Sequence, residues 1–407
     1  MASEISSNPL LSDHIEDNLL ASEGPEENTQ THPALFFLLG NASLLAFNII
    51  INAIDIYIRL TNNNNIGAVL NRFYNIPCSL TSLALCIIKP KNFKLVLIIA
   101  LTALSLLLVG MPLAILIKMS DSAVYWMTMI LSSFVGIFSA CIFSSSYSIA
   151  TQVSPQSTGY ISSGNGCCGV IAAVLRIVTK AAFNKESLET ISSAIYFFLA
   201  DAIIIGTLIY LIKKLQDPLI AAKMAQPSKE EATPLFSKST LNTIKIIWPL
   251  WLSEFCNYMI TLSLFPGYVS QTKDIKTWTP VIVTSIFCVF DWVGRYLPAK
   301  FLWPSQKWAW IPILFRLLSY PIFMLSLQGV INLGEPYWTF LWMIPFATSN
   351  GYFGTVVLIH GSNHSLLTND EKRFAGLLMS FAVNAGILMA TIVSFGIPTP
   401  KSFYTPA

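Results

Sequence analysis

The chain has 407 residues, of which 54% are apolar and 11% are charged, whereas an ordinary soluble domain has about 25% charged residues. This composition excludes most soluble folds, and the mean hydropathy of +0.61 excludes a disordered chain. The formal net charge is +3, although the first 33 residues carry seven acidic residues and no Lys or Arg. Because about 20 mostly apolar residues make one spanning helix, we expect a polytopic membrane protein.

Residues 1–33 are acidic, rich in Ser and Asn, and weakly hydrophobic. Such a segment buries too little apolar surface to fold, so it predicts a disordered, solvated tail. It also lacks the basic start and apolar core of a signal peptide. The seven cysteines lie in apolar stretches, where small buried hydrophobes are typical, and their spacing is not that of a zinc site. We therefore expect no metal and no cofactor.

Hydropathy over a window of about 19 residues predicts eleven spans in two groups. The first six are Leu35–Ile58, Ile66–Ile88, Phe93–Ile117, Ala123–Ala150, Ile161–Phe183 and Ile191–Ile212. The other five are Leu241–Val269, Trp278–Leu302, Trp308–Leu327, Tyr337–Ile359 and Phe374–Ile397. Between them, Lys213–Thr240 holds five lysines and three prolines. We expect a cytoplasmic linker there, joining an N-terminal bundle (34–212) to a C-terminal bundle (241–398) that a short extracellular tail (399–407) follows.

The loops on the two sides of the predicted bundle differ in basic residues. If the N-terminus is inside, the loops on its side hold twelve Lys and Arg, and those on the other side hold seven. Cytoplasmic loops carry the excess of basic residues in membrane proteins. We therefore expect a cytoplasmic N-terminus and an extracellular C-terminus, with the plasma membrane as the location.

Residues 164–169 read Gly-Asn-Gly-Cys-Cys-Gly, which fits the G-x-G-x-x-G pattern of dinucleotide sites. That pattern requires a buried strand before it, whereas residues 157–163 are polar and residues 170–178 continue an apolar span. Close packing of helices through small residues is the better interpretation.

Ionisable residues inside the predicted spans are informative, because a charge at the bilayer centre costs about 2.5 kcal/mol or more. They include Asp55, Arg176, Asp201, Glu254, Asp291, Arg295 and Arg316. Asp55, Glu254 and Arg316 lie near span ends, where we expect them to snorkel or to cap a helix. Asp291 and Arg295 are four residues apart near the middle of the eighth span, and so share a helix face. They would bind a hydroxyl-bearing solute or form a buried ion pair that fixes packing, and their chemistry favours neither.

Several motifs resemble those of the equilibrative nucleoside transporter family, especially its plant and protist members. Residues 44–48 (Leu-Leu-Ala-Phe-Asn) resemble the family's Leu-Leu-Pro-Trp-Asn, and residues 163–166 (Ser-Gly-Asn-Gly) its Ser-Gly-Gln-Gly. Further matches are Leu-Arg-x-x-Thr-Lys-Ala at 175–181, Thr-Leu-Ser-Leu-Phe-Pro-Gly at 261–267, Asp-x-x-Gly-Arg at 291–295 and Ser-Asn-Gly-Tyr at 349–352. Their occurrence in order along the chain carries the resemblance. Residues 136–148 lack the Gln that family members use to read the base closely.

The resemblance implies an all-α fold similar to the major facilitator architecture, with 11 transmembrane helices in a 6+5 arrangement. It implies that the protein is a transporter and not an enzyme. The implied transporter carries nucleosides or nucleobases down their gradient by alternating access. The implied substrate-binding residues are Asp291 and Arg295 for the ribose hydroxyls, Phe47 for the base, and Asn48, Asn350 and Tyr352 for polar lining. The expected partners are a small-molecule nucleoside and the lipid bilayer, with no nucleic acid.

Three other interpretations of the function remain open at this point. A proton-coupled symporter of the same family, in which Asp291 or Asp201 titrates, is the runner-up. A membrane-embedded enzyme is disfavoured, because the sequence shows no His or Cys cluster, no paired carboxylates on one face and no Ser nucleophile beside a base. A receptor has no support beyond the spans themselves.

Overall fold

The computed structural model describes residues 31–396 except for 62, 64–65, 117–118, 184–188, 219–220, 222–236, 266–278, 328–329 and 331–336. The chain divides into two units, Met1–Thr31 and His32–Ala407, and the second carries every helix described below. Most of the predicted acidic tail, most of the linker and the whole C-terminal tail lie outside the described residues.

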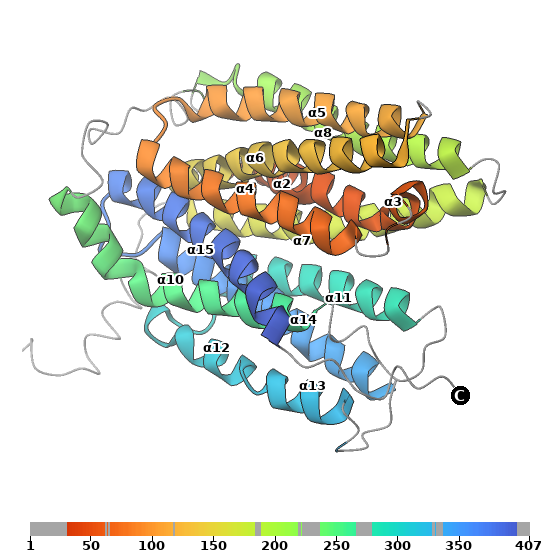
Figure 1. Cartoon of the computed structure of the whole chain (residues 1–407). Helices are drawn as coiled ribbons and strands as arrows, with labels where there is room; N and C mark the ends of the chain where they lie inside the picture. Colours follow the sequence, from red (N-terminus) through yellow and green to blue (C-terminus); the bar gives the residue numbers. More distant parts are fainter. Residues whose placement is uncertain are drawn as a thin grey trace, which may run out of the picture. The chain divides into compact units, whose positions relative to one another are not determined.

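The described residues form helices and no strand, so the predicted all-α class is confirmed. The N-terminal half comprises α2 (Pro33–Asn52), α3 (Ile54–Thr61), α4 (Ile66–Ile88), α5 (Phe93–Leu116), α6 (Asp121–Val153), α7 (Pro155–Ala182) and α8 (Glu189–Lys214). The C-terminal half comprises α10 (Lys238–Leu264), α11 (Thr279–Tyr296), α12 (Trp310–Arg316), α13 (Ser319–Leu327), α14 (Tyr337–Ser362) and α15 (Asn369–Gly396). Two short 3₁₀ turns, Leu297–Ala299 and Gln306–Trp308, connect α11 to α12. Figure 1 shows α2–α8 grouped together and α10–α15 grouped beside them.

Each predicted span coincides with one helix or with a pair of consecutive helices. By length and hydropathy, eight stretches of the described chain are able to cross a membrane. The helices α4, α10 and α14 are not among these eight, because polar residues are distributed along them, such as Asn71 and Asn75, Glu254 and Asn257, and Asn350. The number of eleven spans therefore stays a prediction.

Two of the predicted spans are broken in the structure. The first is divided at Ala53, which ends α2 and donates its backbone N–H to the carbonyls of Ile50 and Ile51. The ninth is divided at residues 317–318, between α12 and α13. Pro321 explains the second break, since proline has no N–H and its ring clashes with the carbonyl four residues earlier, at Leu317.

A sharp turn joins α6 to α7. Ser154 separates the two helices and caps α7, because its hydroxyl accepts a hydrogen bond from the backbone N–H of Ser157 at 3.2 Å. Pro155 follows at the first helical position, where its missing N–H has no cost. We call the end of the bundle that holds this turn the α6/α7 end.

Glycines allow the helices of the N-terminal half to cross closely. A Cβ atom on Gly40 of α2 would lie 2.1 Å from the carbonyl oxygen of Ile161 in α7, and one on Gly164 would lie 2.0 Å from that of Phe37. No larger residue fits at either position. The G-x-G-x-x-G pattern thus contributes to helix packing, as predicted.

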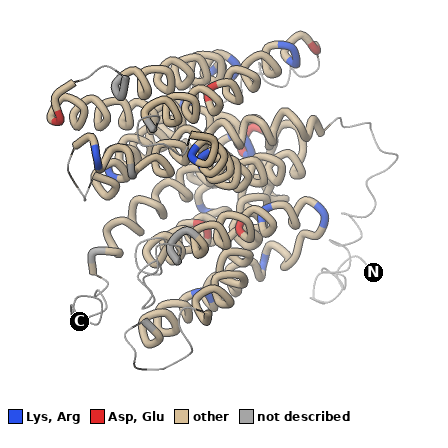
Figure 2. Tube along the Cα trace, turned by 90° about the vertical axis from the view of Figure 1, so that its right-hand side faces the viewer, with Lys and Arg blue, Asp and Glu red and all other residues tan. Residues whose placement is uncertain are grey.

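The helices present apolar side chains outward. Leu80, Leu106 and Leu341 are each at least 60% exposed, and Figure 2 shows charged residues few and separated along the helices. An apolar exposed surface of this kind fits a lipid environment.

Hydrogen bonds join the two halves toward the α6/α7 end. Ser162 of α7 and Thr355 of α14 lie 2.6 Å apart, and Ser148 of α6 donates to the carbonyl of Arg373 in α15 at 3.0 Å. Gln152 reaches the carbonyl of Asn369 at 2.8 Å. Since these residues lie near the last turns of α6 and α14 and the first turns of α7 and α15, the halves are closed together at this end.

Candidate functional site

The centre of the candidate site is an ion pair on α11. Asp291 Oδ2 and Arg295 Nε are 2.7 Å apart, and the two side chains are only 7% and 8% exposed. Four residues of spacing place both on one helix face, as the sequence predicts. A pair this deeply buried is costly to desolvate, so it requires further polar partners to be stable.

Each member of the pair has such a partner on a neighbouring helix. The side-chain amide of Asn350 in α14 donates to Asp291 Oδ1 at 2.7 Å. Arg295 Nη1 donates to the hydroxyl of Tyr258 in α10 at 3.0 Å. Both oxygens of the Asp291 carboxylate are therefore occupied, and its charge is balanced by Arg295.

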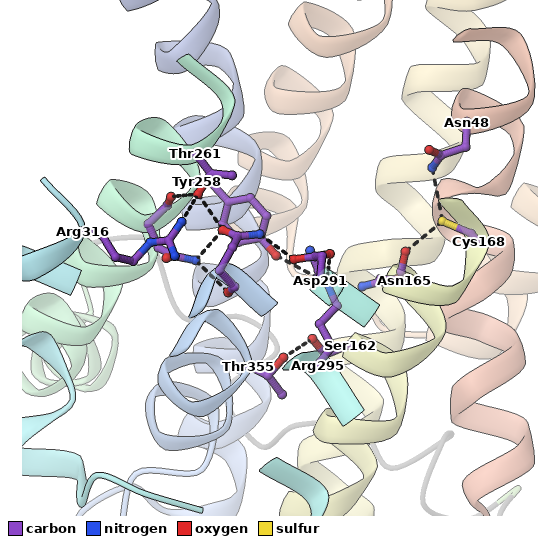
Figure 3. A network of polar contacts seen from close by, with 12 residues as sticks. Asn48, Ser162, Asn165, Cys168, Tyr258, Thr261, Asp291, Arg295, Arg316 and Thr355 are labelled. Carbon is purple, nitrogen blue, oxygen red and sulfur yellow. Dashed lines mark hydrogen bonds and ion pairs between the residues drawn. The ribbon is translucent and has the colours of Figure 1, made fainter. Parts of the chain in front are cut away.

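The network extends from Asn350 to Arg316. Asn350 Oδ1 accepts from Asn257 Nδ2 at 3.1 Å and from the hydroxyl of Thr261 at 2.7 Å. That hydroxyl accepts in turn from Arg316 Nη2 at 2.5 Å. Arg316 also donates to the carbonyl of Phe346 and to Ser349. Figure 3 shows these contacts connecting α10, α11, α12 and α14.

Close approach of α11 and α14 makes the network possible. A Cβ atom on Gly351 would lie 2.0 Å from the backbone oxygen of Asp291, and one on Gly294 would lie 2.3 Å from that of Thr348. The two helices thus cross with backbone nearly against backbone. Asn350 is held beside Asp291 as a result.

Arg295 also borders the N-terminal half. A Cβ atom on Gly166 of α7 would lie 2.7 Å from Arg295 Cδ and 2.9 Å from the Cα of Trp292. The neighbouring Asn165 donates to the hydroxyl of Tyr147 in α6 at 3.0 Å and accepts from Ser43 of α2 at 2.9 Å. A second polar cluster from α2, α6 and α7 therefore lies beside the ion pair.

Asn48 lies where α2, α7 and α11 meet. Its amide nitrogen contacts the sulfur of Cys168 at 3.2 Å and the carbonyl of Leu44 at 3.0 Å. A Cβ atom on Gly169 would lie 3.6 Å from Asn48 Oδ1 and 3.3 Å from the sulfur of Cys288. Cys288 is one helical turn from Asp291, so Asn48 and the ion pair belong to one region.

Phe47 and Tyr352 are placed differently from the rest. Phe47 is half-buried and stacks on Tyr74, with ring centroids 4.0 Å apart and planes inclined by 20°. The hydroxyl of Tyr352 donates to the carbonyl of Phe301 at 3.0 Å and accepts from the backbone N–H of Trp303 at 3.3 Å. Tyr352 thus contacts the connection between α11 and α12, outside the network around Asp291.

Two of the expectations for span ends are wrong. Arg316 does not snorkel outward, because it is 5% exposed and bonded within the network. Glu254 is 0% exposed. A signal for these contacts exists in the sequence: Glu254, Asn257, Tyr258 and Thr261 are spaced as i, i+3, i+4 and i+7, the pattern of one polar helix face. Their partners come from distant segments, which the spacing does not reveal.

Comparison with known proteins shows which family the chain resembles. The family model described as nucleoside transporter matches residues 213–399. Equilibrative nucleoside transporter 1 of Rattus norvegicus is 25% identical over 93% of this chain and 99% of its own length. The chain is thus similar to equilibrative nucleoside transporters along most of its length. Equilibrative nucleotide transporter 8 of Arabidopsis thaliana is 25% identical over 89% of this chain and 93% of its own length. Nucleoside transporter 1.1 of Leishmania donovani is 35% identical over 42% of this chain and 35% of its own length.

Solved structures show the fold. A proton:xylose symporter of the major facilitator superfamily matches with a TM-score of 0.64 and 14% identity, over 91% of this chain and 87% of that chain. The transporter FucP in the outward conformation matches with a TM-score of 0.59 and 12% identity, over 90% of this chain and 95% of that chain. The predicted family resemblance, the major-facilitator-like fold and the assignment as a multi-pass transporter rather than an enzyme are confirmed.

Proposed function

We propose that the protein carries nucleosides across the plasma membrane by facilitated diffusion, with Asp291 and Arg295 at the polar end of the solute site. The observation that carries this proposal is a buried, hydrogen-bonded ion pair on α11 facing Gly166 of the N-terminal half. A purely apolar contact would hold two helices together with less desolvation. We infer that the pair has a use beyond packing, and the similarity to nucleoside transporters supports a role in binding the solute.

Ribose chemistry fits the pair. Each ribose hydroxyl both donates and accepts a hydrogen bond, so a carboxylate and a guanidinium are complementary to two neighbouring hydroxyls. In this structure the side-chain amide of Asn350 donates to Asp291, and the hydroxyl of Tyr258 accepts from Arg295. A bound ribose would replace or share these contacts, while the protein donors keep the charges satisfied when the site is empty.

The remaining side chains divide between the two halves. Phe47 and Asn48 come from α2, whereas Asp291, Arg295 and Asn350 come from α11 and α14. The flat ring of Phe47 would shape the end of the pocket that receives the base. Tyr352 would contribute to the polar lining of the site beside the connection between α11 and α12. Contacts from both halves on one solute are what alternating access requires, because the solute then favours their closure.

With a cytoplasmic N-terminus, the α6/α7 end faces the cytoplasm. The bonds from Ser162 to Thr355 and from Ser148 to Arg373 then close the cytoplasmic side in this conformation. Epitopes placed at the two termini of cell-expressed protein test the orientation. Staining of the C-terminal epitope in intact cells, with the N-terminal one stained only after permeabilisation, is expected, and the reverse result contradicts the orientation.

Uptake by the purified protein tests the function. The full chain is reconstituted in proteoliposomes and offered a panel of radiolabelled purine and pyrimidine nucleosides. Saturable uptake that stops when internal and external concentrations are equal is expected, with competition among nucleosides. Failure to take up any nucleoside above empty liposomes contradicts the proposal.

A further inference from the structure

Arg316 of α12 is a buried cation whose hydrogen bonds end on neutral groups. It is 5% exposed, and its side chain donates to the carbonyl of Phe346, to Ser349 and to the hydroxyl of Thr261. None of these three partners carries a charge. A buried charge without an opposite charge beside it is costly, so Arg316 requires an explanation beyond apolar packing.

A chain of hydrogen bonds leads from Arg316 to the ion pair on α11. Arg316 Nη2 donates to the hydroxyl of Thr261 at 2.5 Å, and that hydroxyl donates to Asn350 Oδ1 at 2.7 Å. The nitrogen of the same amide donates to Asp291 Oδ1 at 2.7 Å. Figure 3 shows this connection between Arg316 and Asp291. A guanidinium has only donors and an ionised carboxylate only acceptors, so each bond between them has its donor on the Arg316 side.

Thr261 transmits this direction because a hydroxyl group has a single proton. Its oxygen accepts from Arg316, which leaves the proton for an acceptor on the far side. Two acceptors lie within reach, the carbonyl of Asn257 at 2.8 Å and Asn350 Oδ1 at 2.7 Å. Asn350 thus presents its oxygen to Thr261 and its nitrogen to Asp291.

The opposite orientation of the Asn350 amide would be unfavourable on both sides. Its oxygen would then face the carboxylate of Asp291. Its nitrogen would face Asn257 Nδ2, which lies 3.1 Å from Asn350 Oδ1 in the structure. Both new contacts would pair like groups, an acceptor with an acceptor and a donor with a donor. The orientation of the amide therefore depends on its partners in α10 as well as on Asp291.

Arg316 also holds the segment of α14 that carries Asn350. Its bonds to Phe346 and Ser349 reach residues four and one positions before Asn350. The ring of Phe346 packs on the guanidinium, with 5.0 Å between the ring centroid and Cζ. One side chain of α12 thus fixes both the hydroxyl of Thr261 in α10 and the turn of α14 from which the amide extends.

We propose that Arg316 is a positioning residue for the solute site: through Thr261 it fixes the amide of Asn350, and so holds the Asp291 carboxylate in the orientation that receives the ribose hydroxyls. This proposal rests on the proposed function. Arg316 itself touches no solute atom in this account. A ribose hydroxyl shares the carboxylate with Asn350, so a misplaced amide weakens the binding of the ribose and leaves the binding of the base unchanged.

Uptake kinetics of two matched pairs of variants test the proposal. Arg316→Met removes the charge and the donors, whereas Arg316→Lys keeps a charge and donors. Thr261→Val removes the hydroxyl and keeps almost the same shape, whereas Thr261→Ser keeps the hydroxyl. KM for initial uptake is measured in proteoliposomes for ribonucleosides and for their dideoxy analogues, which lack both hydroxyls of the sugar ring.

The two classes of substrate should respond differently. We expect Arg316→Met and Thr261→Val to raise KM for ribonucleosides by up to about tenfold, as the loss of one hydrogen bond does, and to change KM for the dideoxy analogues little. Arg316→Lys and Thr261→Ser should lie closer to the wild-type ratio of the two KM values. The control is Thr207→Val of α8, because Thr207 is 1% exposed and its hydroxyl bonds the carbonyl of Ile203 in its own helix.

A purely structural role of Arg316 gives a different result. It would lower the amount of folded protein or the maximal rate for both classes alike. A wild-type ratio of KM values in both Arg316→Met and Thr261→Val therefore overturns the proposal. Should Arg316→Met not fold, Thr261→Val and Thr261→Ser carry the comparison.

Failure of the proposed function is recognised separately. Wild type that takes up no nucleoside, or that does not prefer ribonucleosides, contradicts the proposed function, and thermal unfolding then decides the role of the hydrogen-bond chain. Thr261→Val and Asp291→Asn should shift the unfolding midpoint non-additively, because Asn350 connects the two residues. Thr207→Val combined with Asp291→Asn should be additive. Additive effects in both pairs overturn the proposal.

Discussion

Asn350 of α14 donates a hydrogen bond to Asp291 of α11, with 2.7 Å between Nδ2 and Oδ1. The same two helices approach closely at Gly351, the next residue. The bond therefore ties the charged pair to the helix crossing. Movement of α14 relative to α11 would change the surroundings of the charges.

The Asn350–Asp291 bond should appear as coupling between two substitutions. Asn350→Ala leaves a buried carboxylate oxygen without its donor, at a cost of about 1–3 kcal/mol. Asp291→Asn changes the same contact, so the double variant should be more stable than the sum of the single effects predicts, by about 1 kcal/mol. Thermal unfolding of the detergent-solubilised protein measures this. The control is Asn52→Ala, whose amide bonds the carbonyl of Asn48 in its own helix. Strictly additive effects would show that the bond is absent.

Close crossing of α11 and α14 makes Gly351 intolerant of a side chain. In Gly351→Ala the new Cβ atom would lie 2.0 Å from the Asp291 carbonyl, so the helices must separate. We expect a loss of about 1–3 kcal/mol in stability and reduced uptake. Gly206→Ala is the matched control, because nothing lies within 4 Å of its Cβ position. The unfolding midpoint should fall for the first variant and stay or rise for the second, and equal midpoints would contradict the crossing.

Much of the fold is predictable from hydropathy, because lipid-facing and buried positions in a membrane protein are both apolar. The predicted spans accordingly coincide with helices. The exceptions have local or tertiary causes. The ninth span breaks before Pro321, and α10 is more polar than a lipid-exposed helix because its Asn257 and Thr261 meet Asn350 inside the bundle.

The site is predictable only in part. The helical repeat alone places Asp291 and Arg295 on one face, so their contact follows from four residues of spacing. Arg316 is 21 residues beyond Arg295 and separated from it by two turns, so no local pattern brings it to Thr261 of α10. Tertiary packing decides such contacts, and the sequence of one chain does not contain their geometry.

Phe47 should influence which base is preferred. Its ring is half-buried and lies in α2 beside Asn48, and a flat ring is in general able to stack on a planar base. Phe47→Ala should alter the ranking among purine and pyrimidine nucleosides, measured by competition in cells that lack their own transport. Phe198→Ala is the control, because Phe198 is 43% exposed on α8. An unchanged ranking in Phe47→Ala would assign the ring to packing against Tyr74.

A disulfide between the two halves should hold the α6/α7 end closed. The side-chain oxygens of Ser162 and Thr355 are 2.6 Å apart across the two halves, so cysteines at both positions are close enough for a disulfide after small adjustments. Mild oxidation of Ser162→Cys with Thr355→Cys should reduce uptake at least about tenfold if opening at this end is required, and a reductant should restore it. Each single variant under the same oxidant is the control. A confirmed crosslink with normal uptake would contradict alternating access at this end.

The most direct test of the solute site compares ribonucleosides with their deoxy analogues in the double variant Asp291→Asn with Arg295→Gln. Replacing both charges avoids leaving one of them buried without its partner. Initial uptake rates of both substrate classes are measured in proteoliposomes containing equal amounts of folded protein. If the pair binds the ribose hydroxyls, the variant folds and loses the preference of the wild type between the two classes. A variant that keeps both normal uptake and the full preference would contradict the assignment of Asp291 and Arg295 to the ribose.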